Sequence, residues 1–219
     1  MGTIGIEWVN KYHGRSKDLK NNDNNARGFY NKLHGVRQFE YGDDLAWDQD
    51  FEESGVGSPT AGTDQIYADN VDIIYFSGHG GSAGPSFGVT KYDSGRARHS
   101  EIRLGNRQCE WIVFDACSVL DSGSIANWEN VFNGLHGILG FENSCYDRDD
   151  RGKKFAEFLN AGFFVYLSWV LACIETEDSD VSWAFLFAQQ SVFDCWHGKG
   201  SVSSDPIAPT NFIYLNGPC

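Results

Sequence analysis

The sequence predicts an α/β protein with a mainly parallel sheet flanked by helices on both faces. Apolar runs recur along the 219 residues at intervals that suit alternating strands and helices. Residues 71–78 and 110–117 are continuously apolar, as strands are when both faces of their sheet are covered. The apolar fraction of 41% is enough for one sizeable core, so we expect a single domain over residues 1–219.

The first half of the chain contains strands separated by polar segments. In order, we expect a strand at 3–9, a helix at 24–33, a strand at 37–42 and a strand at 71–78. The helix follows an Asn- and Asp-rich segment of the kind that begins helices. Residues 43–68 are acidic and glycine-rich, and residues 80–107 are rich in Gly, Ser and charge, so both stretches are expected to be loops.

The second half continues the alternation. In order, we expect a strand at 110–117, a helix at 124–135, a strand at 137–143, helices at 151–162 and 180–193, and a final strand at 210–217. The run FFVYLSWVLACI (163–174) has only the length of a core segment, well short of a membrane span. The N-terminal segment shows no basic region followed by an apolar one, so no secretory signal is expected. Because the chain is acidic and has no apolar run of spanning length, no membrane association is expected either.

The charge of the chain excludes some partners. The net charge is −13, from 30 acidic and 17 basic residues. Phosphate binding needs clustered Lys and Arg, so a nucleic-acid binder is not expected. An acidic surface favours basic peptides or divalent cations, and it also simply keeps a protein soluble.

The cysteines show no metal-binding spacing. There is no C-x-x-C motif and no pair of histidines at a ligand spacing, so we expect no metal site. Cys117, Cys145 and Cys173 lie in apolar runs, where cysteine acts as a small hydrophobic residue. The sequence leaves open whether Cys109, Cys195 and Cys219 form disulfides with one another.

Two apolar strands end in side chains with catalytic potential. YFSGHGG (75–81) places His79 among glycines, and IVFDACSVL (112–120) places Cys117 after a small alanine. Either residue alone is more often a turn histidine or an inert buried cysteine. In a parallel sheet, however, the carboxyl ends of the strands share one edge, where functional groups collect. A base and a thiol at one edge are what nucleophilic catalysis by cysteine needs.

The two motifs resemble the catalytic signatures of the caspase-like cysteine peptidases. This superfamily includes caspases, metacaspases, legumains, clostripain and gingipains. IIYFSGHGG and WIVFDACSVLDSG are most similar to the metacaspase pattern, and residues 3–26 resemble its first strand with an insertion. The resemblance implies a caspase-like fold and hydrolysis of peptide or protein substrates by a His79–Cys117 dyad without a cofactor. It also implies an oxyanion hole formed by the amides of Gly80 and Cys117.

The resemblance further implies a substrate pocket and leaves its preference open. Asp115 matches an acidic residue that lines the first specificity pocket of metacaspases and legumains, so cleavage after Arg or Lys is expected through a charge-assisted contact. Other pocket candidates are Glu142, Ser168 and Trp169. Similarity of residues 10–13 to a legumain region keeps an Asn-directed peptidase or ligase as an alternative.

The sequence also departs from the family pattern. The caspase signature Q-A-C-x-G is absent, and Ser118 stands where metacaspases commonly have His. The interval between His79 and Cys117 is shorter than the roughly 50 residues of caspases. The caspase preference for Asp is therefore not expected here.

Three further hypotheses remain. The high aromatic content (15%) suits a non-catalytic binding domain of the same fold. Calcium binding is suggested by an acidic run: Asp43, Asp44, Asp48, Asp50, Glu52 and Glu53. If the chain is processed from a precursor, Lys91, Arg96 and Arg98 in the loop between the motifs are candidate cleavage points.

Overall fold

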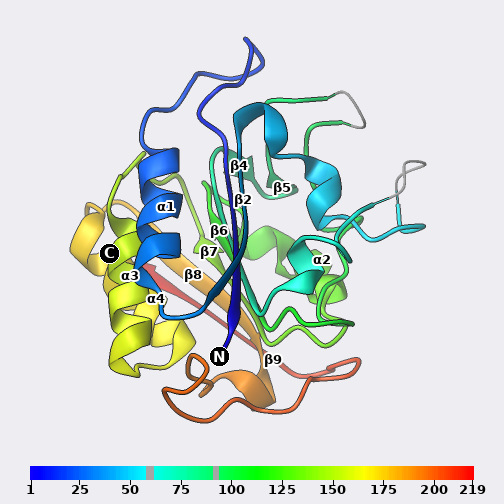
Figure 1. The fold of residues 1–219 in the computed structure, drawn as a ribbon, viewed down its shortest axis with the longest axis vertical. Helices are drawn as coiled ribbons and strands as arrows, with labels where there is room; N and C mark the ends of the chain where they lie inside the picture. The colour runs from blue at the N-terminus through cyan, green and yellow to red at the C-terminus, as the bar shows by residue number, and fades with distance from the viewer. Residues whose placement is uncertain (58–61, 91–93) are drawn as a thin grey trace.

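A seven-stranded, mostly parallel sheet organises the chain (Figure 1). The computed structural model describes residues 1–57, 62–90 and 94–219, so Lys91 lies outside the described part. The strand order is β2-β1-β3-β6-β7-β8-β9. The strands are β1 (Thr3–Trp8), β2 (Val36–Gly42), β3 (Ile73–Ser77), β6 (Trp111–Asp115), β7 (Gly137–Phe141), β8 (Ser182–Ala188) and β9 (Phe212–Pro218).

The first five strands of this order are parallel, β8 pairs antiparallel with β7, and β9 pairs antiparallel with β8. The central pair β3 and β6 is buried along its whole length, which explains the continuous apolar sequence of both strands. A small hairpin of β4 (Gly80–Gly81) and β5 (Gly84–Pro85) follows β3 directly. The general α/β prediction with a mainly parallel sheet is therefore confirmed.

The helices are distributed unequally over the two faces. Three helices cover one face: α1 (Asn22–Lys32), α3 (Arg151–Ala161) and α4 (Val165–Thr176). Helices α1 and α3 approach closely because Gly152 faces the backbone of α1, where a Cβ would lie 2.4 Å from the Asn25 oxygen. The other face is covered by the short helix α2 (Ile125–Trp128), several 3₁₀ turns and the long connections. Helices were expected on both faces, but this second face carries one short α-helix and is covered mainly by 3₁₀ turns and connections.

One predicted helix is a strand. Residues 180–193 were expected to be helical, but Ser182–Ala188 forms β8 between β7 and β9. Trp183, Phe185 and Phe187 pack on one side of the sheet, while Ala184, Leu186 and Ala188 pack on the other. This period of two is the strand pattern, and the density of apolar residues hides it.

Most other elements are close to their predicted positions. One predicted helix is much shortened, and one helix forms where no element was predicted. The helix expected at 124–135 is reduced to α2 and a 3₁₀ turn, Glu129–Val131. The apolar run 163–174 supplies most of α4. No helix in the described ranges combines the length and the apolar character that crossing a membrane requires.

Candidate active site

The register of β3 and β6 brings His79 and Cys117 to the same end of the sheet. Ser77 pairs with Asp115 at the last position of this parallel ladder, and the Gly78 amide donates to the Asp115 carbonyl over 3.1 Å. His79 and Cys117 each lie two residues beyond the Ser77–Asp115 pair. Both line one cavity of about 70 Å³. The structure therefore places the predicted pair together at the carboxyl ends of adjacent strands.

The hydrogen bond to the His79 ring determines which of its nitrogens is free. Its Nε2 lies 2.7 Å from the carbonyl oxygen of Lys17. A carbonyl only accepts, so Nε2 carries the proton and Nδ1 is the unprotonated nitrogen in the neutral ring. The Tyr12 ring packs against the imidazole at 4.6 Å, and the Tyr12 hydroxyl accepts the backbone N–H of His79 over 2.6 Å. The imidazole is thus held in one orientation by groups from the segment after β1.

The Cys117 thiol contacts a second cysteine. Its Sγ lies 3.4 Å from the Sγ of Cys145, and the Cys145 backbone N–H donates to it over 3.2 Å. These hydrogen bonds lower the pKa of Cys117 to about 6, the Cys145 thiol contributing most. Burial opposes the shift, the nearby His79 favours it and Asp115 opposes it. A thiolate is the nucleophilic form of cysteine, so the site contains an activated thiol at neutral pH.

The strain and close packing around Cys117 fix its position. Ser118 has a φ of 56°, an unusual value for a residue with a side chain, and its amide donates to the Asn143 carbonyl. Gly80 lies against this turn, where a Cβ would come within 2.8 Å of Ala116 and 3.0 Å of the Cys117 oxygen. The predicted oxyanion residues Gly80 and Cys117 are therefore neighbours. A larger residue at position 80 would displace the nucleophile.

Asp115 lines the cavity, but its charge is already compensated. Its carboxylate accepts hydrogen bonds from Tyr75 (2.5 Å) and Asn25 (2.5 Å) and forms an ion pair with the fully buried Arg151. Arg151 also pairs with Glu177 at the end of α4. Asp115 therefore lies at the predicted place, held in a buried network that joins β6 to α1, α3 and α4. Its contact with a basic substrate side chain stays a prediction.

The other predicted pocket residues lie elsewhere. Ser168 and Trp169 are fully buried on α4, and Trp169 Nε1 donates to the Gly140 carbonyl from within the core. Glu142 follows β7 and accepts a hydrogen bond from the Tyr214 hydroxyl of β9. These three residues do not line the cavity that contains His79 and Cys117. The structure thus assigns them to packing and strand association, which corrects the expectation of substrate contact.

Apart from Gly78, the remaining lining of the cavity comes from segments that the two motifs do not include. It consists of Leu19, Asn22, Asn25, Gly78, Cys145, Tyr146, Asp147 and Arg148. Asp147 accepts the backbone amides of Lys20 and Asn21, which joins the segment before α1 to the segment before α3. Cys145 has one visible signal in the sequence, because it follows β7, the strand next to β6. Arg151 has no such signal, because a helix-starting arginine is normally exposed.

The acidic run proposed for calcium is engaged in local contacts. Asp43 accepts the amides of Asn10 and Lys11, and Asp48 accepts the amides of Gly95 and Arg96. Within residues 1–57, 62–90 and 94–219, the oxygens of this run do not gather into a set of three close metal ligands. Calcium binding there remains a prediction. The six cysteines, all in described segments, are free thiols, so none of the disulfides left open among Cys109, Cys195 and Cys219 is formed.

Comparison with known proteins places the whole domain in one family. No curated protein matches the chain. A family model described as a domain of unknown function, DUF6345, matches residues 6–217, from the middle of β1 to the next-to-last residue of β9. The chain therefore belongs to the DUF6345 family.

Proposed function

We propose that the chain is a caspase-like cysteine endopeptidase in which Cys117 is the nucleophile and His79 the proton carrier. The observation that carries this proposal is the shared cavity at the ends of β3 and β6, with a thiol whose pKa is lowered to about 6. The fully buried Cys109 and Cys173, by contrast, have raised pKa values because burial disfavours their thiolates. The strand order and the S-G-H-G and D-A-C motifs support the caspase-like assignment.

The chemistry follows from the protonation states of the two residues. The Cys117 thiolate attacks the scissile carbonyl carbon, and the amides of Gly80 and Cys117 receive the oxyanion. The His79 imidazolium gives its Nδ1 proton to the leaving amine, because its Nε2–H is held by the Lys17 carbonyl. A water then attacks the thioester, and the neutral Nδ1 takes its proton. The acid product leaves with Cys117 again a thiolate.

Substrate preference is the narrower part of the proposal. Cleavage after Arg or Lys is expected from Asp115, which lines the cavity, and from the acidic net charge. Asp147 adds a second carboxylate to the lining, whereas Arg148 adds a cation. Cleavage after Asn would favour the legumain-like alternative with the same dyad.

Covalent labelling with substrate-like electrophiles tests this proposal. The protein is treated with peptidyl chloromethyl ketones ending in Arg, Lys, Asn or Asp, and the adduct is located by peptide mass spectrometry. We expect one adduct at Cys117, formed faster with one terminal residue than with the others and absent in Cys117→Ala.

The matched control is Cys219→Ala. Cys219 is half-buried and also has a lowered pKa, through a hydrogen bond with Cys173. It lies outside the cavity and should therefore not influence labelling. Equal labelling of Cys117 and Cys219 with no dependence on the peptide would overturn the peptidase proposal. It would favour the non-catalytic binding domain.

A further inference from the structure

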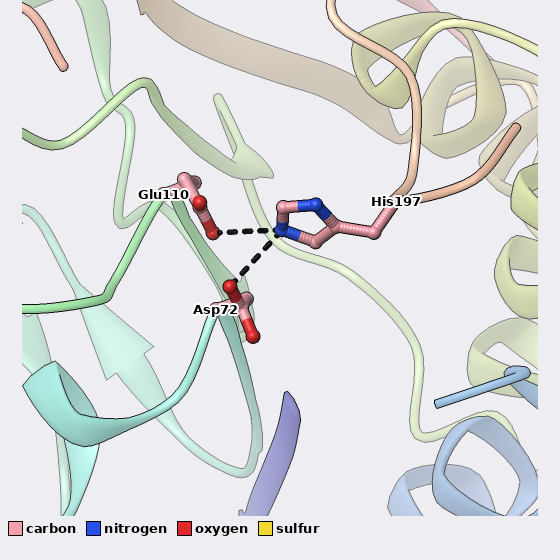
Figure 2. Close-up of side chains that lie close together, drawn as sticks. All are labelled: Asp72, Glu110 and His197. Carbon is pink, nitrogen blue, oxygen red and sulfur yellow. Dashed lines mark hydrogen bonds and ion pairs between the residues drawn. The ribbon is translucent and has the colours of Figure 1, made fainter. Parts of the chain in front are cut away.

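A second cluster of reactive side chains lies at the opposite end of the same two strands. Asp72 immediately precedes β3 and Glu110 immediately precedes β6, whereas His79 and Cys117 follow these strands. Five residues of extended chain separate the two ends, about 17 Å. His197, from the connection between β8 and β9, completes the cluster. Figure 2 shows its ring directed between the two carboxylates.

The three side chains converge on a small volume. His197 Nε2 lies 3.0 Å from Asp72 Oδ1 and 3.3 Å from Glu110 Oε2 (Figure 2). One donor atom from each residue falls within 4.8 Å of the others. In a tetrahedral site with bonds of about 2.0–2.1 Å, neighbouring ligand atoms are about 3.4 Å apart. The observed separations are therefore close to those that a bound metal requires.

From this geometry we infer that Asp72, Glu110 and His197 form a site for a divalent transition-metal ion such as Zn²⁺. The donor set is one imidazole nitrogen and two carboxylate oxygens, which suits zinc and its neighbours better than calcium, an ion that prefers oxygen alone. The ligands come from three separate segments, which explains why no metal motif is visible in the sequence.

The residues around the three ligands hold their side chains in place. The second oxygen of Asp72 accepts both the backbone N–H and the hydroxyl of Thr3, which leaves Oδ1 directed at His197. Such outer partners orient metal ligands in known sites. The rings of Trp111 and Trp196 pack against His197 at 5.7 and 5.3 Å. Each of the three side chains is three-quarters or more buried.

A cavity beside the cluster leaves room for a further ligand. It measures about 160 Å³ and is lined by Asp72, Glu110 and a third carboxylate, Asp205. This volume accommodates several water molecules, so water can complete the coordination. The buried Nε2 of His136 has no hydrogen-bond partner among the described residues and lies 3.5 Å from Asp205 Oδ1. Arg107 also lines the cavity, but its guanidinium donates to Gln65.

The competing interpretation is a protonated ion triad. The two carboxylates raise the pKa of His197 to about 9, so a proton between these groups holds them together where no cation is bound. A bound ion would join the β8–β9 connection to the two central strands and stabilise the fold by mass action.

Titration with Co²⁺ and Zn²⁺ distinguishes the two interpretations. Co²⁺ is followed by its visible absorption and Zn²⁺ by calorimetry, on the Cys117→Ala protein, so that the thiol cavity does not bind the metal. We expect one ion per chain, no near-ultraviolet thiolate band and a higher melting temperature. His197→Gln and Glu110→Gln should abolish binding. Thr3→Val should weaken it by about 10–100-fold, because Asp72 loses its orientation.

The control is His34→Gln, which removes an exposed histidine outside the cluster and should leave binding unchanged. Absence of saturable binding up to millimolar metal, or binding that persists in His197→Gln, would overturn the inference and leave the protonated triad. Neither result depends on peptidase activity, so the outcome is independent of the proposed function.

Discussion

The sulfur atoms of Cys117 and Cys145 lie 3.4 Å apart, and the thiol of Cys145 stabilises the thiolate of Cys117. Cys145 follows β7, the strand adjacent to β6, so the nucleophile and its hydrogen-bond donor come from neighbouring strands of the parallel sheet. The charge state of the nucleophile therefore depends on a residue outside the two sequence motifs.

The first prediction concerns the pH dependence of Cys117 reactivity. The rate of its alkylation by iodoacetamide should rise with pH around a midpoint near 6, because the thiolate is the reactive form. Cys145→Ala removes the largest stabilising hydrogen bond, so the midpoint should move up toward the ordinary thiol value. Cys219→Ala should leave it unchanged. An unshifted midpoint in Cys145→Ala would show that the thiol of Cys145 does not tune the nucleophile.

The second prediction concerns oxidation of the same pair. A peroxide should convert the Cys117 thiolate to sulfenic acid, and the Cys145 thiol should then displace water to form a disulfide. The sulfur atoms need only approach from 3.4 Å to about 2.0 Å. Peptide mapping should find this bond after mild oxidation and lose it after dithiothreitol. Cys145→Ser should instead accumulate sulfinic acid at Cys117. If wild type and Cys145→Ser accumulate equal sulfinic acid, Cys145 does not protect the nucleophile.

The third prediction concerns the buried ion pair beneath the cavity. Arg151→Gln leaves the carboxylates of Asp115 and Glu177 without their buried cation, and should lower the free energy of unfolding by about 3–5 kcal/mol. Arg151→Lys should not restore stability, because one ammonium cannot reproduce the forked guanidinium contacts. The comparison variant is Arg148→Gln, whose partly exposed guanidinium pairs with the exposed Asp178 and, over a longer 3.6 Å, with Glu177 itself; its loss leaves Arg151 in place and should cost about 1 kcal/mol or less. Urea unfolding measures all three, and equal losses for Arg151→Gln and Arg148→Gln would contradict the network.

The fourth prediction concerns a buried pair of carboxyl groups in the face opposite the long helices. Burial raises the pKa of Glu7 well above its usual value and that of Asp50 to about 6, and the protonated Glu7 donates to Asp50. Both acids hold protons more tightly when folded, so their contribution to stability is present at low pH. It is lost as the pH rises through about 6 and beyond.

Glu7→Gln tests this pair, because the amide still donates to Asp50 but does not ionise. Its free energy of unfolding should fall less than that of wild type between pH 6 and pH 9, by on the order of 1 kcal/mol or more. Glu157→Gln, at a partly exposed position outside this pair, should follow the wild-type slope. Parallel curves for Glu7→Gln and wild type would show that folded Glu7 is already ionised at pH 6, and so that its pKa is not raised as described.

The sequence predicts the sheet better than it predicts the site. The apolar strands β3 and β6 are visible because both faces are buried, and their ends locate His79 and Cys117. Strand β8 has the sequence pattern of a buried helix as much as of a strand, because aromatic residues alternate with small or aliphatic ones and every position after Ser182 is apolar. Periodicity analysis needs polar positions to distinguish a strand from a helix.

The site residues that sequence reasoning missed depend on tertiary contacts. Arg151 begins a helix, an ordinary place for an exposed arginine, and only the fold shows that it is buried against Asp115. Asp72, Glu110 and His197 lie far apart in the chain and meet only because β3 and β6 start side by side. Trp169 and Ser168 are the reverse case. They were expected to contact substrate, but the helix that carries them packs against the sheet and places their side chains in the core.

Peptide hydrolysis tests the central claim most directly. Fluorogenic peptides with Arg, Lys, Asn or Asp before the cleaved bond are assayed with wild type, Cys117→Ala, His79→Ala and Cys219→Ala, with and without calcium. The account predicts cleavage after Arg or Lys by wild type and Cys219→Ala. It predicts no activity in Cys117→Ala, and about 10²–10⁴-fold slower turnover in His79→Ala. Full activity in Cys117→Ala, or no cleavage of any peptide by a wild-type protein that is folded and has a free Cys117, would contradict it.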